Sequence, residues 1–152
     1  IDTFLGSGME HASVDLRSMY DQFEENLREY MDDGRVIAYQ SRSDNPDLIK
    51  SFEDNSVAAV IIDGDHTLES VEDDVYNWWP KVIEGGIMVG DDINLDSVKQ
   101  GCYKGLSRHG IDTVTHCKGE EGWFAKIKHP DADKLGEQLK LIPGVNSMKL
   151  DG

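Results

Sequence analysis

The sequence feature that most constrains the fold is the continuous apolar run 57–62, which ends abruptly in the acidic segment 63–66, Asp-Gly-Asp-His. An apolar run of this length without polar alternation is typical of a strand buried on both faces, as in the middle of a parallel sheet. A second short apolar segment, 87–89, ends in the same way at residues 90–92, Gly-Asp-Asp. We therefore expect two neighbouring parallel strands whose carboxyl ends both carry acidic side chains.

Strand-like apolar segments and segments of helical periodicity alternate along the rest of the chain. This alternation favours βαβ units and a mainly parallel sheet. Helices are expected over 14–33, directly after Asn45-Pro46, from about 67 to 79 and over 95–106, and further strands over 35–39, 113–116 and 123–127. The predicted fold is a Rossmann-like, mostly parallel α/β sheet flanked by helices. Residues 1–142 would form this domain, with a last helix over 131–141, and residues 143–152 would form an irregular tail.

The composition restricts the partners of the protein. Its 152 residues suffice for one domain with one sizeable core. The 30 Asp and Glu residues against 15 Lys and Arg give a formal net charge of -15, which repels phosphate groups. We therefore expect no nucleic-acid or membrane partner, and instead a small-molecule ligand or a divalent metal. No apolar segment has the length of a membrane span. Cys102 and Cys117 lie in different expected elements, which indicates free thiols and a cytoplasmic protein.

The two acidic strand ends predict a cation site. Neighbouring parallel strands end at the same edge of a sheet, and open α/β sheets bind their ligands there. Clustered carboxylates repel one another unless a cation lies between them. Oxygen ligands with water in the remaining positions suit Mg²⁺, with Mn²⁺ or Ca²⁺ as alternatives. An interpretation that the pattern supports equally well is that these aspartates cap helices and form turns.

A spaced motif in the chain resembles a known family. The motif consists of residues 61–69 (Ile-Ile-Asp-Gly-Asp-His-Thr-Leu-Glu), Asp74, 78–80 (Trp-Trp-Pro), Gly85-Gly86 and 90–92. It resembles class I S-adenosylmethionine-dependent methyltransferases related to the macrocin-type sugar O-methyltransferases, over residues 1 to about 127. The resemblance implies metal-dependent transfer of a methyl group from S-adenosylmethionine to a hydroxyl of a small, sugar-like acceptor. Leu68, where an aromatic is usual, and Arg42, where many class I enzymes have an acid, depart from the family pattern.

The resemblance also implies roles for the residues at the two strand ends. Asp63, Asp91 and Asp92 match the metal ligands of the family, and His66 matches its general base. The ordinary pKa of histidine suits proton transfer near neutrality. Asp65 is expected to support the loop or the cofactor.

Three further residues are placed near cofactor or acceptor by the resemblance. Asp2 matches the acid that binds the ribose hydroxyls, and Ser43 matches a serine near the adenine. A simple turn residue is an equally good interpretation of Ser43. His11 lies where the family has substrate-facing residues, and its alternative is an exposed loop histidine.

The first residues of the chain resemble the end of the family's second strand. We therefore expect a domain truncated at its N-terminus, without the first strand and its glycine-rich loop, and inactive alone. Three alternatives stay open: a non-catalytic remnant, a subunit completed by a partner or by another copy in a homo-oligomer, and a different, hydroxylase-like metal enzyme on the same scaffold.

Overall fold

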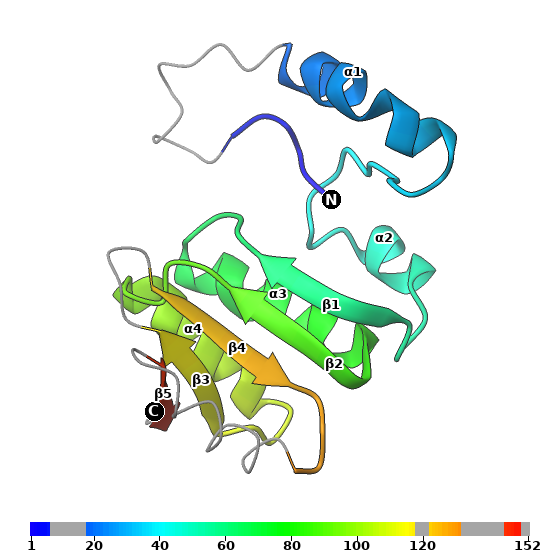
Figure 1. Ribbon diagram of the computed structural model, residues 1–152. Coiled ribbons are helices and arrows are strands. Elements are labelled where there is room, and N and C mark those ends of the chain that lie inside the picture. The colour runs from blue at the N-terminus through cyan, green and yellow to red at the C-terminus, as the bar shows by residue number, and fades with distance from the viewer. Residues whose placement is uncertain (7–17, 118–121, 132–144, 150–152) are drawn as a thin grey trace.

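The computed structural model describes residues 1–6, 18–117, 122–131 and 145–149 (Figure 1). Its sheet has the strand order β1-β2-β4-β3-β5. The strands are β1 (Val57–Ile62), β2 (Val82–Gly90), β3 (Thr113–Cys117), β4 (Trp123–Ile127) and β5 (Val145–Lys149). β1 and β2 are parallel, whereas β4 is antiparallel to β2 and β3, and β5 is antiparallel to β3. The predicted α/β sheet with flanking helices is observed, but the described sheet is mixed and not mostly parallel, because only the pair β1 and β2 is parallel.

The described helices lie within or close to the segments where helical periodicity and the pair Asn45-Pro46 predict them. They are α1 (Met19–Asp32), α2 (Pro46–Ser51), α3 (Leu68–Trp78), the short 3-10 helix η1 (Trp79–Lys81) and α4 (Asp96–Ser107). The Asn45 side chain accepts the backbone N–H groups that begin α2, and Thr67 does the same for α3. None of the described helices is both long enough and apolar enough to cross a membrane.

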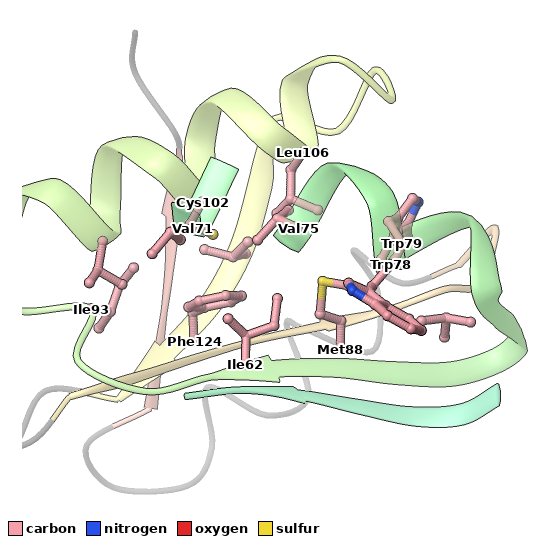
Figure 2. Close-up of a cluster of buried hydrophobic side chains, with 13 residues drawn as sticks. Ile62, Val71, Val75, Trp78, Trp79, Met88, Ile93, Cys102, Leu106 and Phe124 are labelled. Atoms are coloured by element: carbon pink, nitrogen blue, oxygen red, sulfur yellow. The ribbon is translucent and has the colours of Figure 1, made fainter. Parts of the chain in front are cut away.

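The hydrophobic core lies between the sheet and the pair α3 and α4, which run side by side over one face (Figures 1 and 2). Its most deeply buried side chains are Val75, Val82, Met88, Cys102, Leu106, Val114 and Phe124. Trp78 and Trp79 belong to the core, as expected. Cys102 is a free thiol, and burial raises its pKa. Gly105 allows the close approach of the two helices, because a Cβ there would lie 2.7 Å from the Cβ of Val75.

β1 differs from the expected strand buried on both faces. It is an edge strand of the described sheet. Ile61 is 76% exposed, whereas Ile62, which points to the opposite face, is 8% exposed. Ile62 is buried because α3 and α4 cover the face of the sheet to which it points. Ile61 is exposed because these helices do not cover the opposite face, and β1 also lines a cavity. The apolar run correctly predicted a strand, but not its place in the sheet.

Two predicted elements take another form. The predicted strand over 35–39 does not form, and a single parallel bridge joins Asp2 to Gln40 instead. Asp2 N donates to Tyr39 O at 3.0 Å, and Ser41 N donates to Asp2 O at 3.0 Å. The strand expected at 87–89 is longer, because β2 begins at Val82 and contains an irregularity at Gly85, which has a φ of 80° and donates its N–H to Lys128 O at 2.7 Å.

The prediction of an irregular tail after residue 142 is wrong for 145–149, because these residues form β5. Backbone pairs join β5 to β3, from Thr113 with Lys149 to Cys117 with Val145. This strand forms because the backbone groups at the edge of β3 are available for pairing. The sequence of 145–149 alone does not indicate that β3 is its partner. Residues 132–141 of the predicted last helix lie outside the described part of the chain.

Candidate active site

The backbone brings the two acidic segments together at one edge of the sheet. Ile62, the last residue of β1, is the register partner of Gly90, the last residue of β2. Asp91 N then donates to Ile62 O at 3.1 Å, so the chain segments that follow the two strands begin side by side. The meeting of the segments 63–66 and 90–92 that the sequence predicts is therefore observed, at the edge where open α/β sheets bind ligands.

Asp63, His66 and Asp92 form a compact cluster. Each offers one ligand atom, and these three atoms lie within 4.8 Å of one another. The closest pair is His66 Nε2 and Asp92 Oδ2, at 3.3 Å. Asp63 is exposed, while the other two are half-buried. Two carboxylates and an imidazole beside solvent can hold a divalent cation whose remaining ligands are water or a bound substrate.

Asp91, the third predicted metal ligand, is not part of this cluster. Its Oδ1 accepts the backbone N–H of Asp92 at 2.9 Å. Asp92 has a φ of 56°, in the left-handed region that aspartate tolerates better than most residues. This local turn places the carboxylate of Asp92 in the cluster, while the carboxylate of Asp91 is hydrogen-bonded to the backbone. Among the described residues, His66 takes the place in the cluster that the sequence suggested for Asp91.

Asp65 supports the loop between β1 and α3. Its Oδ1 accepts the backbone N–H of Thr67 at 3.1 Å, and its Oδ2 accepts the hydroxyl of Ser70 at 3.2 Å. These bonds fix the segment that carries Asp63 and His66 onto the first turn of α3. The structure thus gives Asp65 the first of its two predicted roles, and its side chain also borders the cavity described next.

A cavity of about 710 Å³ lies between β1 and the segments 1–6 and 41–44. Its volume falls within the range of small-molecule sites, roughly 300–1,000 Å³. The acidic residues in its wall are Asp2, Asp44, Asp63, Asp65 and Asp74. Arg42 also lines the cavity, but its guanidinium is paired with Asp44 through Nη2 and Oδ2 at 2.7 Å, which lowers the pKa of the Asp44 carboxyl. This excess of carboxylates favours a ligand that carries positive charge.

Asp2 and Ser43 both line the cavity, as their predicted cofactor roles require. Asp2 Oδ1 accepts the backbone N–H of Phe4 at 2.6 Å, which fixes its carboxylate beside the bridge to Gln40. Ser43 O accepts the indole N–H of Trp78 at 3.1 Å. His11, the predicted substrate-facing residue, lies outside the described residues.

Asp74, a motif residue without a predicted role, lies in the cavity wall. Asp74 is 8% exposed and lines the cavity together with Ser43. Burial raises its pKa above the ordinary value, and the Ser43 side chain, which can donate to the carboxylate, opposes part of that effect. A sequence signal for it exists: Asp74 lies at helical spacing between Val71 and Trp78, on the apolar face of α3.

Comparison with known proteins finds a family and a solved structure that this chain is similar to. The model of a family described as "Methyltransferase domain" matches residues 4–93, more than half of the chain. A search among curated proteins finds no match. A crystal structure of a protein from Corynebacterium glutamicum, a target of the Northeast Structural Genomics Consortium, is similar with a TM-score of 0.53 and 16% identity. The alignment covers 74% of this chain and 57% of that chain, and at this identity it concerns the fold alone.

Proposed function

Because the chain belongs to this family of methyltransferase domains, we propose that it serves the transfer of a methyl group from S-adenosylmethionine to a hydroxyl of a small, sugar-like acceptor. We further propose that a divalent cation assists the transfer, as in the macrocin-type enzymes that the sequence resembles. The observation that carries the proposal is the cluster of Asp63, His66 and Asp92 at the edge of an acidic cavity.

The cavity supports S-adenosylmethionine as the donor by its charge and by its polar groups. The cofactor carries a sulfonium and an ammonium group, and both are attracted by surrounding carboxylates. We assign Asp2 to the ribose hydroxyls, because one oxygen of its carboxylate is held by the Phe4 N–H and the second oxygen can accept from a ligand. Ser43, on the same wall, is assigned to the adenine side.

The ligand atoms of the cluster fit a divalent cation. Asp63 and Asp92 supply the carboxylate oxygens that Mg²⁺ and Mn²⁺ prefer, and water would fill the remaining positions. A cation bound there would lower the pKa of an acceptor hydroxyl, which is the chemistry that it supplies. Asp91 would then act through the backbone of Asp92, by the 2.9 Å bond that fixes the turn.

We assign His66 as the general base. Its Nε2 lies 3.3 Å from Asp92 Oδ2, so an N–H at Nε2 would donate to the carboxylate. This arrangement places the lone pair on Nδ1, which is the atom that would accept the proton of the hydroxyl. The rest of the catalysis is alignment of oxygen, methyl carbon and sulfur.

Thermal unfolding with added metal tests the cation site. Mg²⁺ or Mn²⁺ should raise the melting temperature, because a ligand of the native state stabilises it by mass action. The double variant Asp63→Asn and Asp92→Asn should lose this gain. A matched control is the double variant Glu53→Gln and Asp112→Asn, which removes two exposed charges away from the cluster. A melting temperature of the unaltered protein that does not respond to either metal would refute the site.

Methyl transfer from labelled S-adenosylmethionine to a panel of vicinal diols tests the reaction itself. His66→Ala should lower turnover roughly 10²–10⁴-fold, the usual contribution of a general base. Affinity for S-adenosylmethionine should stay unchanged, because His66 is assigned to the acceptor side. Loss of metal affinity in the same variant would make His66 a ligand instead of the base.

A further inference from the structure

Asp74 is the one buried carboxylate in the described part of the chain. It lies on the face of α3 that carries the core residues Val71, Val75 and Trp78. A carboxylate among apolar side chains loses its hydration, and this loss favours the neutral form. The position therefore calls for an explanation other than packing.

The contacts of Asp74 converge on Ser43. The Ser43 side chain, which can donate to the Asp74 carboxylate, lies near enough to lower its pKa. The indole N–H of Trp78, one helical turn further along α3, donates to Ser43 O at 3.1 Å. Two side chains of one helix thus face the same residue, one at its hydroxyl and the other at its backbone. Asp74 also lies beneath the loop after β1, since a Cβ at Gly64 would be 3.9 Å from Asp74 Oδ2. It therefore lies where α3 meets both of the loops that line the cavity.

Within the described segments, no lysine or arginine forms an ion pair with this carboxylate. Arg42 is the cation that faces it, but its guanidinium is committed to Asp44, with distances of 2.9 and 2.7 Å. Asp44 in the loop and Asp73 on α3 add negative charge near Asp74, and with burial they raise its pKa. When the pKa of an acid is higher in the folded protein than in the unfolded chain, its ionisation at neutral pH lowers the free energy of unfolding. Stability alone does not account for an aspartate at this position.

We propose that Asp74 is a positioning residue, which fixes Ser43 and the loop 41–45 at the adenine end of the cavity. This inference rests on the proposed function, because it takes S-adenosylmethionine as the ligand of the cavity. Asp74 acts on the cofactor through Ser43 and does not reach the reacting atoms at the metal cluster. Its loss should therefore weaken cofactor binding and leave metal binding intact.

Calorimetric titration with S-adenosylhomocysteine tests this role. Asp74→Ala and Ser43→Ala should each weaken binding about tenfold, the equivalent of one hydrogen bond of about 1.4 kcal/mol. The double variant should lose no more than either single variant, because both remove the same contact. Asp74→Asn should restore part of the affinity, since its amide oxygen can still accept from Ser43. The shift of the melting temperature with Mg²⁺ should be the same in all of them, whereas a collapsed site would lose both ligands.

The indole N–H resonance of Trp78, assigned with Trp78→Phe, gives a readout without cofactor. It should move in Asp74→Ala and return toward its place in Asp74→Asn, because the bond to Ser43 O depends on the position of the loop. An unmoved resonance with unchanged affinity would overturn the inference. Failure of the unaltered chain to bind S-adenosylhomocysteine would overturn the proposed function and the role of Asp74 in cofactor affinity, and the resonance would then decide the positioning of Ser43 separately.

Discussion

Helices α1 and α3 show how similar sequence patterns lead to different degrees of packing. Both carry apolar residues at helical spacing, yet α1 has no buried residue, whereas α3 buries Val71, Asp74, Val75 and Trp78. Two rings of α1 contact Phe4, with centroid distances of 5.0 Å to Tyr20 and 5.1 Å to Phe23. Periodicity therefore identifies the face of a helix that is available for packing, but the neighbouring elements decide how much of that face is covered.

The candidate site spans both regions. Asp63, His66 and Asp92 follow strands that α3 and α4 pack against, while Asp2 lies in the thinly packed N-terminal segment. The loop 41–45 joins the two regions and is bound to α3 through Ser43. The half of the candidate site that is proposed to bind a metal should therefore be rigid, and the half that is proposed to bind the cofactor should depend on a few contacts.

The largest difference in stability between the two regions is expected when a phenylalanine is truncated in each of them. Phe124→Ala should lower the free energy of unfolding by about 3–5 kcal/mol, because its ring is fully buried in the core. Phe23→Ala in α1 removes the same atoms from a half-buried position and should cost less than half as much. Urea denaturation measures both values. Equal losses would show that the two regions are equally well packed.

A smaller loss is expected where α3 and α4 touch. Gly101→Ala should lower the free energy of unfolding by about 1–3 kcal/mol, because the new Cβ would lie 2.6 Å from the backbone oxygen of Leu68. Helix propensity alone predicts the opposite sign, a gain of about 1 kcal/mol. Ser107→Ala, at an exposed position of the same helix, is the control for propensity. A stabilised Gly101→Ala protein would mean that the helices can separate at little cost.

Local chemistry explains why much of the fold and half of the site were predictable from the sequence. The helix starts at Asn45 and Thr67 need only their own side chains and the next turn of backbone. The meeting of Asp63 with Asp92 follows from two parallel neighbouring strands. These features depend on short segments or on one rule of topology.

The features that were missed depend on contacts between distant segments or on single dihedral angles. The place of β1 at the edge depends on which strands pair with it. The formation of β5 depends on the edge of β3, with which it pairs. The exchange of Asp91 for His66 in the cluster follows from one left-handed residue, Asp92. The role that we propose for Asp74 depends on its nearness to Ser43, which helical spacing alone cannot indicate.

The pH dependence of Asp74→Asn tests the cost of the residue that joins the two regions. The pKa of Asp74 is raised in the folded protein, so the unfolded chain ionises first as the pH rises through its ordinary value of 3.8. The unaltered protein should therefore lose stability relative to Asp74→Asn as the pH rises through this region, and the difference should be constant above the folded pKa. Urea denaturation at pH 3 and pH 7 measures the change. A variant that instead loses stability relative to the unaltered protein between pH 3 and pH 7 would show that the ionised carboxylate stabilises the fold.

The smallest effect concerns a few backbone amides, and it tests whether the cofactor joins the two regions. In hydrogen exchange without ligand, amides of α1 should exchange faster than those of α3, because exposed helices open locally at low free energy. S-adenosylhomocysteine should then slow exchange in the segments 1–6 and 39–45, which it would contact, and leave α3 unchanged, since α3 is already protected by the core. Protection that appears in α3 instead would place the ligand on the packed region alone. Uniform protection of α1 and α3 before any ligand is added would remove the difference between the regions, and the cofactor half of the site would then be as rigid as the metal half.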